Sequence, residues 1–283
     1  MPRRLRWLTP YLFLVPGGLW LVAFFVVPMI AMSAVSLQTG SLTTGYELTW
    51  NFGVYAEVVE SWSTQIVRSI VYALTVTALT LLIGYPIAYT IAFRGGRYRT
   101  ILLLLVILPF FTAFVIRTLN WRLILADNGF VLGTLKDWGL LEPTAHVLAT
   151  PLAVVSGLTY NWLPFMVLPL YVALERIDPR LIEAANDLYS DRLQAFRRIT
   201  LPLSMPGLVA GSLIVFIPTV GDFVNAELLG SRETTMIGNV IQRLFLQTNA
   251  YPEAAALSFV LMFAVLVLVA LYARAVGTAN LTR

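Results

Sequence analysis

The sequence predicts an all-α integral membrane protein with about six transmembrane helices, and composition is the first observation behind that fold class. Of the 283 residues, 58% are hydrophobic and only 12% are charged, whereas a soluble globular domain carries about 25% charged residues. A chain with so little charge cannot cover its own apolar surface in water, and a lipid environment removes that cost. Sheet-type alternation of apolar and polar residues is absent from the sequence, which argues against a transmembrane barrel.

The second observation is the length of the apolar stretches. A hydrocarbon core of about 30 Å needs about 20 helical residues, and six stretches reach that length. They cover residues 11–37, 66–93, 101–125, 147–174, 203–228 and 254–273. We expect them to form a single transmembrane domain over residues 1–283. The first stretch is longer than the roughly 7–15-residue apolar region of a signal peptide, so we expect it to be retained as a helix.

The basic residues predict the orientation, because cytoplasmic loops of membrane proteins are enriched in Lys and Arg. The side with the two termini holds thirteen of the nineteen: Arg3, Arg4, Arg6, Arg94, Arg97, Arg99, Arg176, Arg180, Arg192, Arg197, Arg198, Arg274 and Arg283. The opposite side and its span ends hold the other six: Arg68, Arg117, Arg122, Lys136, Arg232 and Arg243. This asymmetry predicts that both termini lie in the cytoplasm.

The residue types present exclude several kinds of site. The sequence has no cysteine and a single histidine, His146, which leaves no thiolate chemistry and no histidine cluster for a metal. It has no GxxxxGK(S/T) phosphate loop, and its only lysine, Lys136, lies in a predicted outward loop without that glycine pattern. The basic residues lie between apolar spans, which indicates membrane topology rather than nucleic-acid binding. We expect no catalytic residue, no metal and no cofactor on this chain.

The predicted outward loops, at residues 38–65 and 126–146, are long and contain aromatic residues. Two interpretations are open for them. They are contacts for an extracytoplasmic partner, or they are solvated loops with no partner.

The polar segment at residues 175–202 separates two predicted spans, and we expect it to form two short amphipathic helices. Asp178 followed by Pro179 is a good helix start, with a side-chain acceptor at the N-cap and proline at the first helical position. Pro202 is expected to end or kink the second helix. Apolar positions recur at helical spacing along both helices: Leu181, Ala184, Ala185 and Leu188, then Leu193, Phe196 and Ile199. Helix physics alone leaves two interpretations: docking in a groove of a soluble partner, or resting on the bilayer surface.

The same segment resembles the EAA motif of ABC importer permeases: Glu-Ala-Ala, three residues, Gly, nine residues, Ile, one residue, Leu-Pro. The residues that match are Glu183, Ala184, Ala185, Ile199, Leu201 and Pro202. Tyr189 stands where the family has glycine, so we expect a turn remodelled around Ser190 and Asp191. The resemblance implies an ATPase-coupling surface made of Glu183, Ala184, Ala185, Asp187, Leu188, Tyr189, Phe196, Ile199, Leu201 and Pro202.

The resemblance to ABC importer permeases also implies the fold and the partners. The fold is that of type I importers, in a multi-pass protein of the bacterial cytoplasmic (inner) membrane. ATP and magnesium are expected on separate ATP-binding cassette ATPase subunits. A second homologous permease chain would complete the path through the lipid bilayer, because no internal repeat is evident in this chain. An extracytoplasmic binding protein would deliver the solute.

The remainder of the chain looks most like the spermidine/putrescine-type permeases. The segments that carry this likeness are residues 84–89, 108–111, 117–121, 127–129, 221–224 and 236–241. The resemblance implies import of a small cationic solute by alternating access. Permeases for ferric iron or thiamine share parts of the architecture and remain alternatives.

The residue chemistry is compatible with a cationic solute. Asp222 and Glu227 lie in or near the predicted fifth span, where a carboxylate costs up to about 3 kcal/mol unless it faces a cavity or a partner. The candidate path residues are Asp222, Glu227, Tyr160, Trp162, Trp121 and Arg117, with the aromatic rings as cation–π surfaces. The alternative for Asp222 is an ion pair with Arg117 or Arg122 that only braces the bundle. An ion-coupled secondary transporter is a weaker hypothesis, since it predicts titratable residues in several spans.

Overall fold

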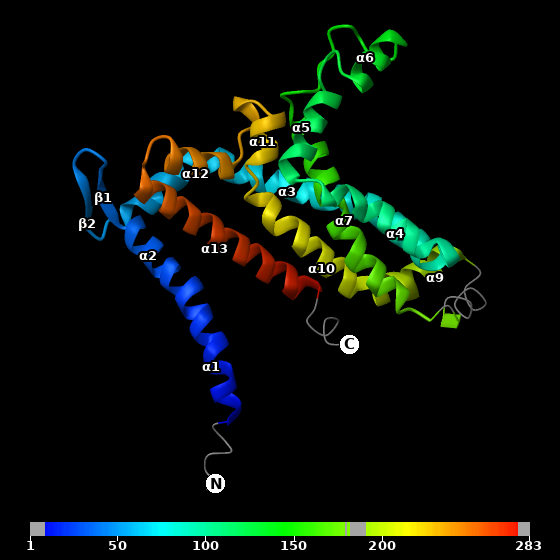
Figure 1. Ribbon diagram of the computed structural model, residues 1–283, viewed down its shortest axis with the longest axis horizontal. Helices are drawn as coiled ribbons and strands as arrows, with labels where there is room; N and C mark the ends of the chain where they lie inside the picture. Colours follow the sequence, from blue (N-terminus) through cyan, green and yellow to red (C-terminus); the bar gives the residue numbers. More distant parts are fainter. Residues whose placement is uncertain (1–8, 179, 182–190, 277–283) are drawn as a thin grey trace. The chain divides into compact units, whose positions relative to one another are not determined.

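The computed structural model describes residues 9–178, 180–181 and 191–276, and most of this part is helical (Figure 1). The chain divides into two compact units. The first takes its residues from 1–63 and 241–263, and the second from 64–240 and 264–283. Three helices have residues in both units: α3 (Gly53–Arg94), α12 (Ile237–Leu246) and α13 (Tyr251–Val276).

The first unit begins with a long apolar helix. α1 (Thr9–Leu21) and α2 (Val27–Ser36) are joined by a π-helical turn over Val22–Val26. Proline cannot donate a backbone hydrogen bond and its ring crowds the preceding turn, and Pro28 follows this turn directly. The wider turn lets the helix continue through the proline. The result is one candidate span over Phe13–Ser36.

A β-hairpin, which the apolar pattern does not predict, follows the first span. β1 (Gln38–Ser41) and β2 (Gly45–Leu48) pair antiparallel, with Gln38 opposite Leu48. The Tyr46 hydroxyl donates to the carbonyl oxygen of Asn249, and the Tyr46 and Tyr251 ring centroids lie 5.5 Å apart. These contacts hold the hairpin to the start of α13.

The second unit contains the packed core. α7 (Pro151–Glu175) and α10 (Leu201–Val220) run side by side (Figure 1, green and yellow). Small residues allow the close approach: a Cβ on Gly207 would lie 2.5 Å from the Ala173 Cβ, and one on Gly211 would lie 2.9 Å from the Met166 Sδ. Packing of this kind is typical of membrane helices, which have no hydrophobic drive to associate in lipid. The fully buried side chains of α7 include Leu158, Met166, Leu170 and Leu174.

The remaining helices of the second unit are shorter. They are α4 (Arg99–Ile107), α5 (Phe114–Ile124), α6 (Phe130–Asp137), α9 (Arg192–Ala195) and α11 (Val224–Leu229), with 3-10 turns at Gly96–Tyr98, Leu108–Phe111 and Arg232–Thr234. The residues between α9 and α10, Phe196–Thr200, form a second π-helical turn. Pro202 follows it as Pro28 follows the first, so α9 runs into α10 without a break. The expectation that Pro202 ends or kinks the helix is therefore corrected.

The third predicted span, residues 101–125, also needs correction. The chain forms two helical pieces there, Gly96–Phe111 and Phe114–Ile124, bent by 92° at the break (Figure 1, α4 and α5). Thr112 and Ala113 are extended, with ψ of 144° and 138°. The apolar composition of residues 101–125 correctly indicates that they are compatible with lipid, but it does not predict where the helix breaks. The described residues therefore contain five helices long enough to span a membrane, or six if the bent pair counts as one.

Several span limits differ from the predicted ones. The second spanning helix starts at Gly53 rather than residue 66, although its backbone is kinked at Trp62. The fifth covers Leu193–Val220 rather than 203–228. Asp222 and Glu227 consequently lie beyond the helical span, with Asp222 in the connection between α10 and α11 and Glu227 in α11.

Candidate functional site

A buried polar network lies at the centre of the second unit. The Asn161 Nδ2 on α7 donates to the Thr118 Oγ1 on α5 at 3.1 Å and to the Asn225 Oδ1 on α11 at 3.0 Å. The Asn225 Nδ2 donates in turn to the Asp222 Oδ2 at 3.1 Å. All four side chains are buried. Because an unpaired buried polar group is costly, the network fixes α5, α7 and α11 relative to one another.

Asp222 owes its position to the end of α10. The helix stops at Val220, and the Asp222 Oδ1 accepts the backbone N–H of Asn225 at 2.8 Å, which fixes the first turn of α11. Asp222 lies outside the spanning helix, and burial raises the pKa of its carboxyl from 3.8 to about 6 against the opposing effect of hydrogen bonds from Asn225 and Ala226. In the described part of the chain, neither Arg117 nor Arg122 forms an ion pair with it. The bracing ion pair considered from the sequence is therefore replaced by the asparagine network.

An aromatic pocket opens beside this network at the break between α4 and α5. We call it the break pocket. Its volume is about 540 Å³, and it is lined by Phe110, Phe111, Thr112, Ala113, Phe114, Arg117, Asn161, Trp162 and Phe165. The Phe110 and Phe165 rings pack edge to face with centroids 4.8 Å apart, and the Trp162 and Phe165 rings are tilted to each other with centroids 5.2 Å apart. Two candidate path residues, Arg117 and Trp162, thus line one pocket.

Arg117 is held against the aromatic wall of the break pocket. Its guanidinium carbon lies 5.0 Å from the Phe110 ring centroid and 5.8 Å from that of Phe114. Its Nη1 donates to the Pro109 carbonyl oxygen at a long 3.5 Å. The side chain is only 6% exposed. The cation is stabilised by ring faces rather than by a carboxylate.

The other candidate path residues do not line this pocket. The Trp121 and Tyr160 rings meet edge to face with centroids 5.3 Å apart. Glu227 accepts a hydrogen bond from the Asn239 Nδ2 at 3.2 Å, and the same nitrogen donates to the Phe223 carbonyl oxygen at 2.8 Å. The structure therefore brings Arg117 and Trp162 together at the pocket. Asp222 does not line the pocket but is connected to it through the hydrogen bonds of Asn225 and Asn161. Glu227 lies in a separate contact.

Three polar residues of this site were missed from the sequence: Thr118, Asn161 and Asn225. The available signal was the amide of Asn161 inside an apolar span, where an unpaired polar group is expensive. The pairing of Asn161 with Asn225 was not accessible, because the two residues come from different helices 64 positions apart.

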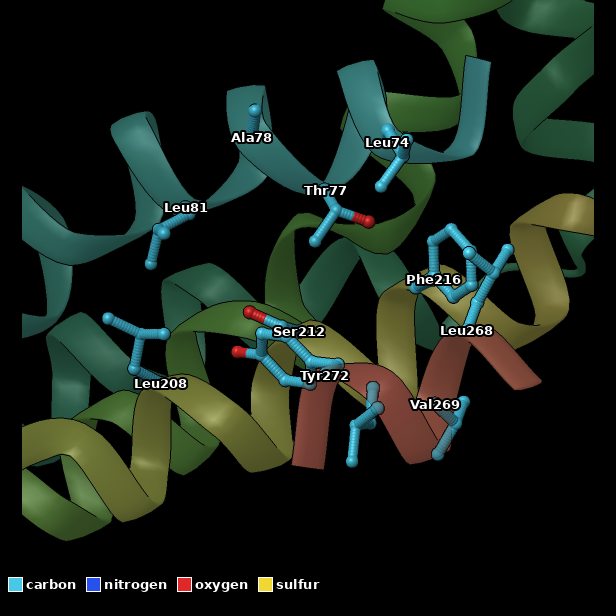
Figure 2. Close-up of a pocket in the computed structure, with 11 residues that line it drawn as sticks. Leu74, Thr77, Ala78, Leu81, Leu208, Ser212, Phe216, Leu268, Val269 and Tyr272 are labelled. Carbon is cyan, nitrogen blue, oxygen red and sulfur yellow. The ribbon is translucent and has the colours of Figure 1, made fainter. Parts of the chain in front are cut away.

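A second cavity, of about 340 Å³, has a different character. It lies among α3, α10 and α13, and Figure 2 shows Leu81, Leu208 and Phe216 on its walls. The polar groups in the lining are the hydroxyls of Thr77, Ser212 and Tyr272. None of the described residues that line it is charged or among the predicted path residues. This cavity offers no charge compensation to a cationic solute.

The predicted coupling surface is described only in part. Glu183, Ala184, Ala185, Asp187, Leu188 and Tyr189 lie outside the described residues. On either side of them, Asp178 and Asp191 each cap a helix start: the Asp178 Oδ1 accepts from the Arg180 N–H at 2.9 Å, and the Asp191 Oδ1 accepts from the Leu193 N–H at 3.0 Å. The helix-start prediction at Asp178 agrees with this geometry.

The rest of that surface lies against the bundle. The Phe196 ring meets the Tyr85 ring of α3 edge to face, with centroids 5.5 Å apart. The Tyr85 hydroxyl lies 2.8 Å from the Ser204 Oγ of α10. Ile199 is half-buried, and Leu201 and Pro202 begin α10. Phe196 therefore connects this segment to both α3 and α10.

A second connection joins the end of α7 to the start of α4. The Arg99 Nη1 lies 2.6 Å from the Glu175 Oε1, and the Arg99 Nη2 donates to the Ala92 carbonyl oxygen at 2.8 Å. The guanidinium also lies 6.0 Å from the Tyr171 ring centroid. These contacts join α3, α4 and α7 next to the segment that follows Glu175.

The described residues contain five apolar helices long enough to span a membrane, a bent helix pair and a buried polar network, and these features define a multi-pass membrane protein. The chain belongs to the family described as binding-protein-dependent transport system inner membrane component, whose model matches residues 52–277. It is a permease subunit of an ABC importer and a multi-pass protein of the inner membrane.

Individual relatives agree with this family. The chain is 38% identical over 257 residues to the spermidine/putrescine transport system permease protein PotB of Haemophilus influenzae, with 90% of each chain covered. It is 35% identical to the protein of the same name from Escherichia coli, over 90% of this chain and 94% of that one. Among solved structures, a bacterial alginate ABC transporter in complex with its periplasmic protein shares the fold, with a TM-score of 0.72, 24% identity and 99% of each chain covered.

Proposed function

We propose that this permease moves a small cationic solute of the polyamine type, such as spermidine or putrescine, across the cytoplasmic membrane by alternating access. The observation that carries the proposal is the 38% identity to a spermidine/putrescine permease over 90% of both chains. The site adds chemical support, because the buried carboxylate of Asp222 is connected through Asn225 to Asn161, which lines an aromatic pocket.

The proposed assembly has four kinds of component. This chain and a second homologous permease form the path, and an extracytoplasmic binding protein delivers the solute. Separate ATPase subunits hold ATP and magnesium, since the sequence has no phosphate loop of its own. We propose that both termini and the 175–202 segment lie on the cytoplasmic side, and the arginine asymmetry supports this orientation.

The proposed coupling runs through contacts already described. Movement of the ATPases displaces the surface formed by Glu183, Ala184, Ala185, Asp187, Leu188, Tyr189, Phe196, Ile199, Leu201 and Pro202. The Phe196–Tyr85 and Tyr85–Ser204 contacts carry that displacement to α3 and α10. The Arg99–Glu175 pair carries it to α4 and α7. A rigid-body shift of these helices then changes which side of the membrane the path faces.

The test is uptake by the complete transporter in proteoliposomes. We expect ATP-dependent uptake of labelled spermidine or putrescine that requires the binding protein and both permeases. Asp222→Asn should reduce this uptake, whereas Asp137→Asn, in α6 and away from the network, should leave it unchanged. Absence of amine uptake by a complex that hydrolyses ATP would refute the polyamine assignment. Uptake insensitive to Asp222→Asn would remove the carboxylate from the path.

The coupling surface has its own test. Pull-down with the ATPase subunits should recover a complex that Glu183→Ala combined with Asp187→Ala weakens. Arg232→Ala, on the predicted outer side, is the control and should leave the complex intact. Stable ATPase binding by the double variant would refute the assigned surface.

A further inference from the structure

The cavity among α3, α10 and α13 is elongated along its helices, and we call it the three-helix cavity (Figure 2). Its lining runs from Leu74 to Leu81 on α3 and from Leu208 to Phe216 on α10. At about 1.5 Å of rise per residue, these stretches are about 10–12 Å long. Leu74 is also 54% exposed, so the cavity opens at the surface of helices that are long and apolar enough to span a membrane. In a bilayer, lipid hydrocarbon surrounds that surface.

The chemistry of the lining excludes two occupants. Eight of the eleven lining residues are apolar, and the other three carry hydroxyl groups: Thr77, Ser212 and Tyr272. A protonated amine finds no charged partner among these side chains, so the proposed cargo is not stabilised there. A water molecule needs about two to four polar partners, which an apolar lining does not supply along the length of the cavity.

Two of the three hydroxyls have no hydrogen bond. The Thr77 Oγ1 donates to the Ala73 carbonyl oxygen at 2.7 Å, whereas Ser212 and Tyr272 have no hydrogen-bond partner in the described part of the chain. Ser212 is 7% exposed and Tyr272 is half-buried. Neither oxygen is among the fully occluded unpaired atoms of the described residues, so an occupant of the cavity reaches both. Because buried polar groups are nearly always paired, these hydroxyls indicate an occupant with a hydrogen-bond acceptor.

The dimensions of the cavity favour a single chain over a protein helix. One helical turn with its side chains, about 10 Å wide and 5.4 Å high, occupies about 400 Å³. The three-helix cavity holds about 340 Å³, and its length corresponds to about two such turns. A helix of the second permease therefore does not fit, but an extended hydrocarbon chain does.

We infer that the three-helix cavity binds one acyl chain of a membrane phospholipid, and that the ester carbonyl oxygen of this chain accepts hydrogen bonds from Ser212 and Tyr272. A carbonyl oxygen accepts and a hydroxyl donates, so the pairing needs no charge. Tyr272 lies about one turn before the end of α13 at Val276, and tyrosine is common where a spanning helix meets the lipid headgroups. The chain then continues toward Leu74 and Phe216. This inference goes beyond the proposed transport and does not depend on the cargo.

The test is photolabelling of the complete transporter in nanodiscs. The probes are a phosphatidylcholine with a diazirine in one acyl chain and its dialkyl ether counterpart, which has no ester carbonyl. We expect the ester lipid to label Leu268 and Val269 about two- to tenfold more strongly than the ether lipid, because only the ester accepts from the hydroxyls. Leu82, a 71% exposed residue of α3 outside the lining, is the internal reference and should be labelled equally by both probes. Equal labelling of Leu268 and Val269 by the two probes would overturn the inference.

Two substitutions assign the labelling to the cavity. Tyr272→Phe removes the hydroxyl and keeps the ring, so it should reduce the preference for the ester lipid. Tyr89→Phe, at a half-buried position of α3 outside the lining, should preserve that preference. Ala78→Phe adds a ring to the lining and should reduce labelling by both probes several-fold. Ala210→Phe, at an exposed alanine of α10 that does not line the cavity, is its matched control.

A preference that survives Tyr272→Phe, or labelling that Ala78→Phe does not reduce, would overturn the inference. Two further measurements distinguish other occupants. Native mass spectrometry should detect a retained phospholipid, and a retained free fatty acid in its place would overturn the phospholipid as occupant. The chain has no cysteine, so Val269→Cys supplies a single thiol on this subunit. We expect no cross-link from that thiol to the second permease, and such a cross-link would show that protein rather than lipid covers the cavity.

Discussion

The Asn161 Nδ2 lies 3.0 Å from the Asn225 Oδ1, and this amide pair joins the middle of α7 to the short helix α11. Asn161 has a further bond to Thr118, and Asn225 has two to Asp222. The two amides therefore stand between the carboxylate of Asp222 and the break pocket. Each amide orients the next group, so the pocket and the turn after α10 are mechanically linked.

Asn225→Ala should destabilise the protein more than loss of a single hydrogen bond. It leaves the Asp222 carboxylate without its side-chain donor and removes an acceptor from Asn161 and Thr118. Hydrogen bonds between membrane helices average about 0.6 kcal/mol, but each buried group left unpaired costs about 1–3 kcal/mol. We expect a loss of about 2–4 kcal/mol, measured by thermal unfolding in nanodiscs. Asn128→Ala, at an exposed position, is the control, and an equal effect of both substitutions would contradict the network.

Stability should depend on pH through Asp222. Its folded-state pKa of about 6 lies above the value of 3.8 for the free side chain, so the folded protein holds the proton more tightly. The resulting stabilisation is complete below about pH 4 and is lost as pH rises through 6. The shift corresponds to about 3 kcal/mol. Unfolding temperatures at pH 4.5, 6 and 7.5 should show the wild type losing stability relative to Asp222→Asn as pH rises. A difference that does not change with pH would show that the carboxyl is not desolvated.

Gly207→Ala should disturb the packing of α7 against α10. The added methyl group would collide with the Pro169 carbonyl oxygen and lie 2.5 Å from the Ala173 Cβ. Backbone atoms cannot move aside as a flexible side chain can, so the helices must separate at a cost of about 1–3 kcal/mol. Gly18→Ala is the matched control, because a methyl group there would meet no atom within 4 Å. Detergent-solubilised protein should show a lower unfolding temperature only for Gly207→Ala, and equal unfolding temperatures would refute the close approach.

The sequence predicted the parts of the fold that depend on local composition. The length of the apolar stretches located the spans near residues 11–37 and 254–273, because a helix that crosses lipid needs a long run of hydrophobic residues. The same reasoning missed the break at Thr112 and Ala113, since both residues are compatible with lipid and the extended backbone depends on tertiary packing. It also placed Asp222 too deep in the fifth span, because apolar composition alone does not show that α10 ends at Val220.

The sequence also predicted only some residues of the candidate site. Arg117 and Trp162 were chosen for charge and aromatic character, and the structure places both at the break pocket. Trp121 and Tyr160 were chosen on the same ground, but they pack on each other. Residue type alone cannot separate a ring that lines a cavity from a ring that packs on another, because that distinction depends on helix rotation and neighbours.

Phe196→Ala should uncouple ATP hydrolysis from transport. The Phe196 ring is the described contact between the 175–202 segment and Tyr85 of α3, and Tyr85 in turn bonds to Ser204 of α10. Truncation to alanine removes an edge-to-face pair worth about 0.5–1.5 kcal/mol beyond its burial, which leaves the fold largely intact but loosens the connection. In proteoliposomes containing the complete transporter, we expect solute uptake to fall several-fold while ATPase activity and subunit association persist. Tyr85→Phe keeps the ring pair and removes only the hydroxyl, so it should have a smaller effect on uptake. Phe263→Ala, a 69% exposed ring on α13, is the control for loss of an aromatic side chain. Proportional loss of uptake and ATPase activity in Phe196→Ala would mean that the ring supports assembly rather than coupling, because a coupling contact changes the ratio of the two activities.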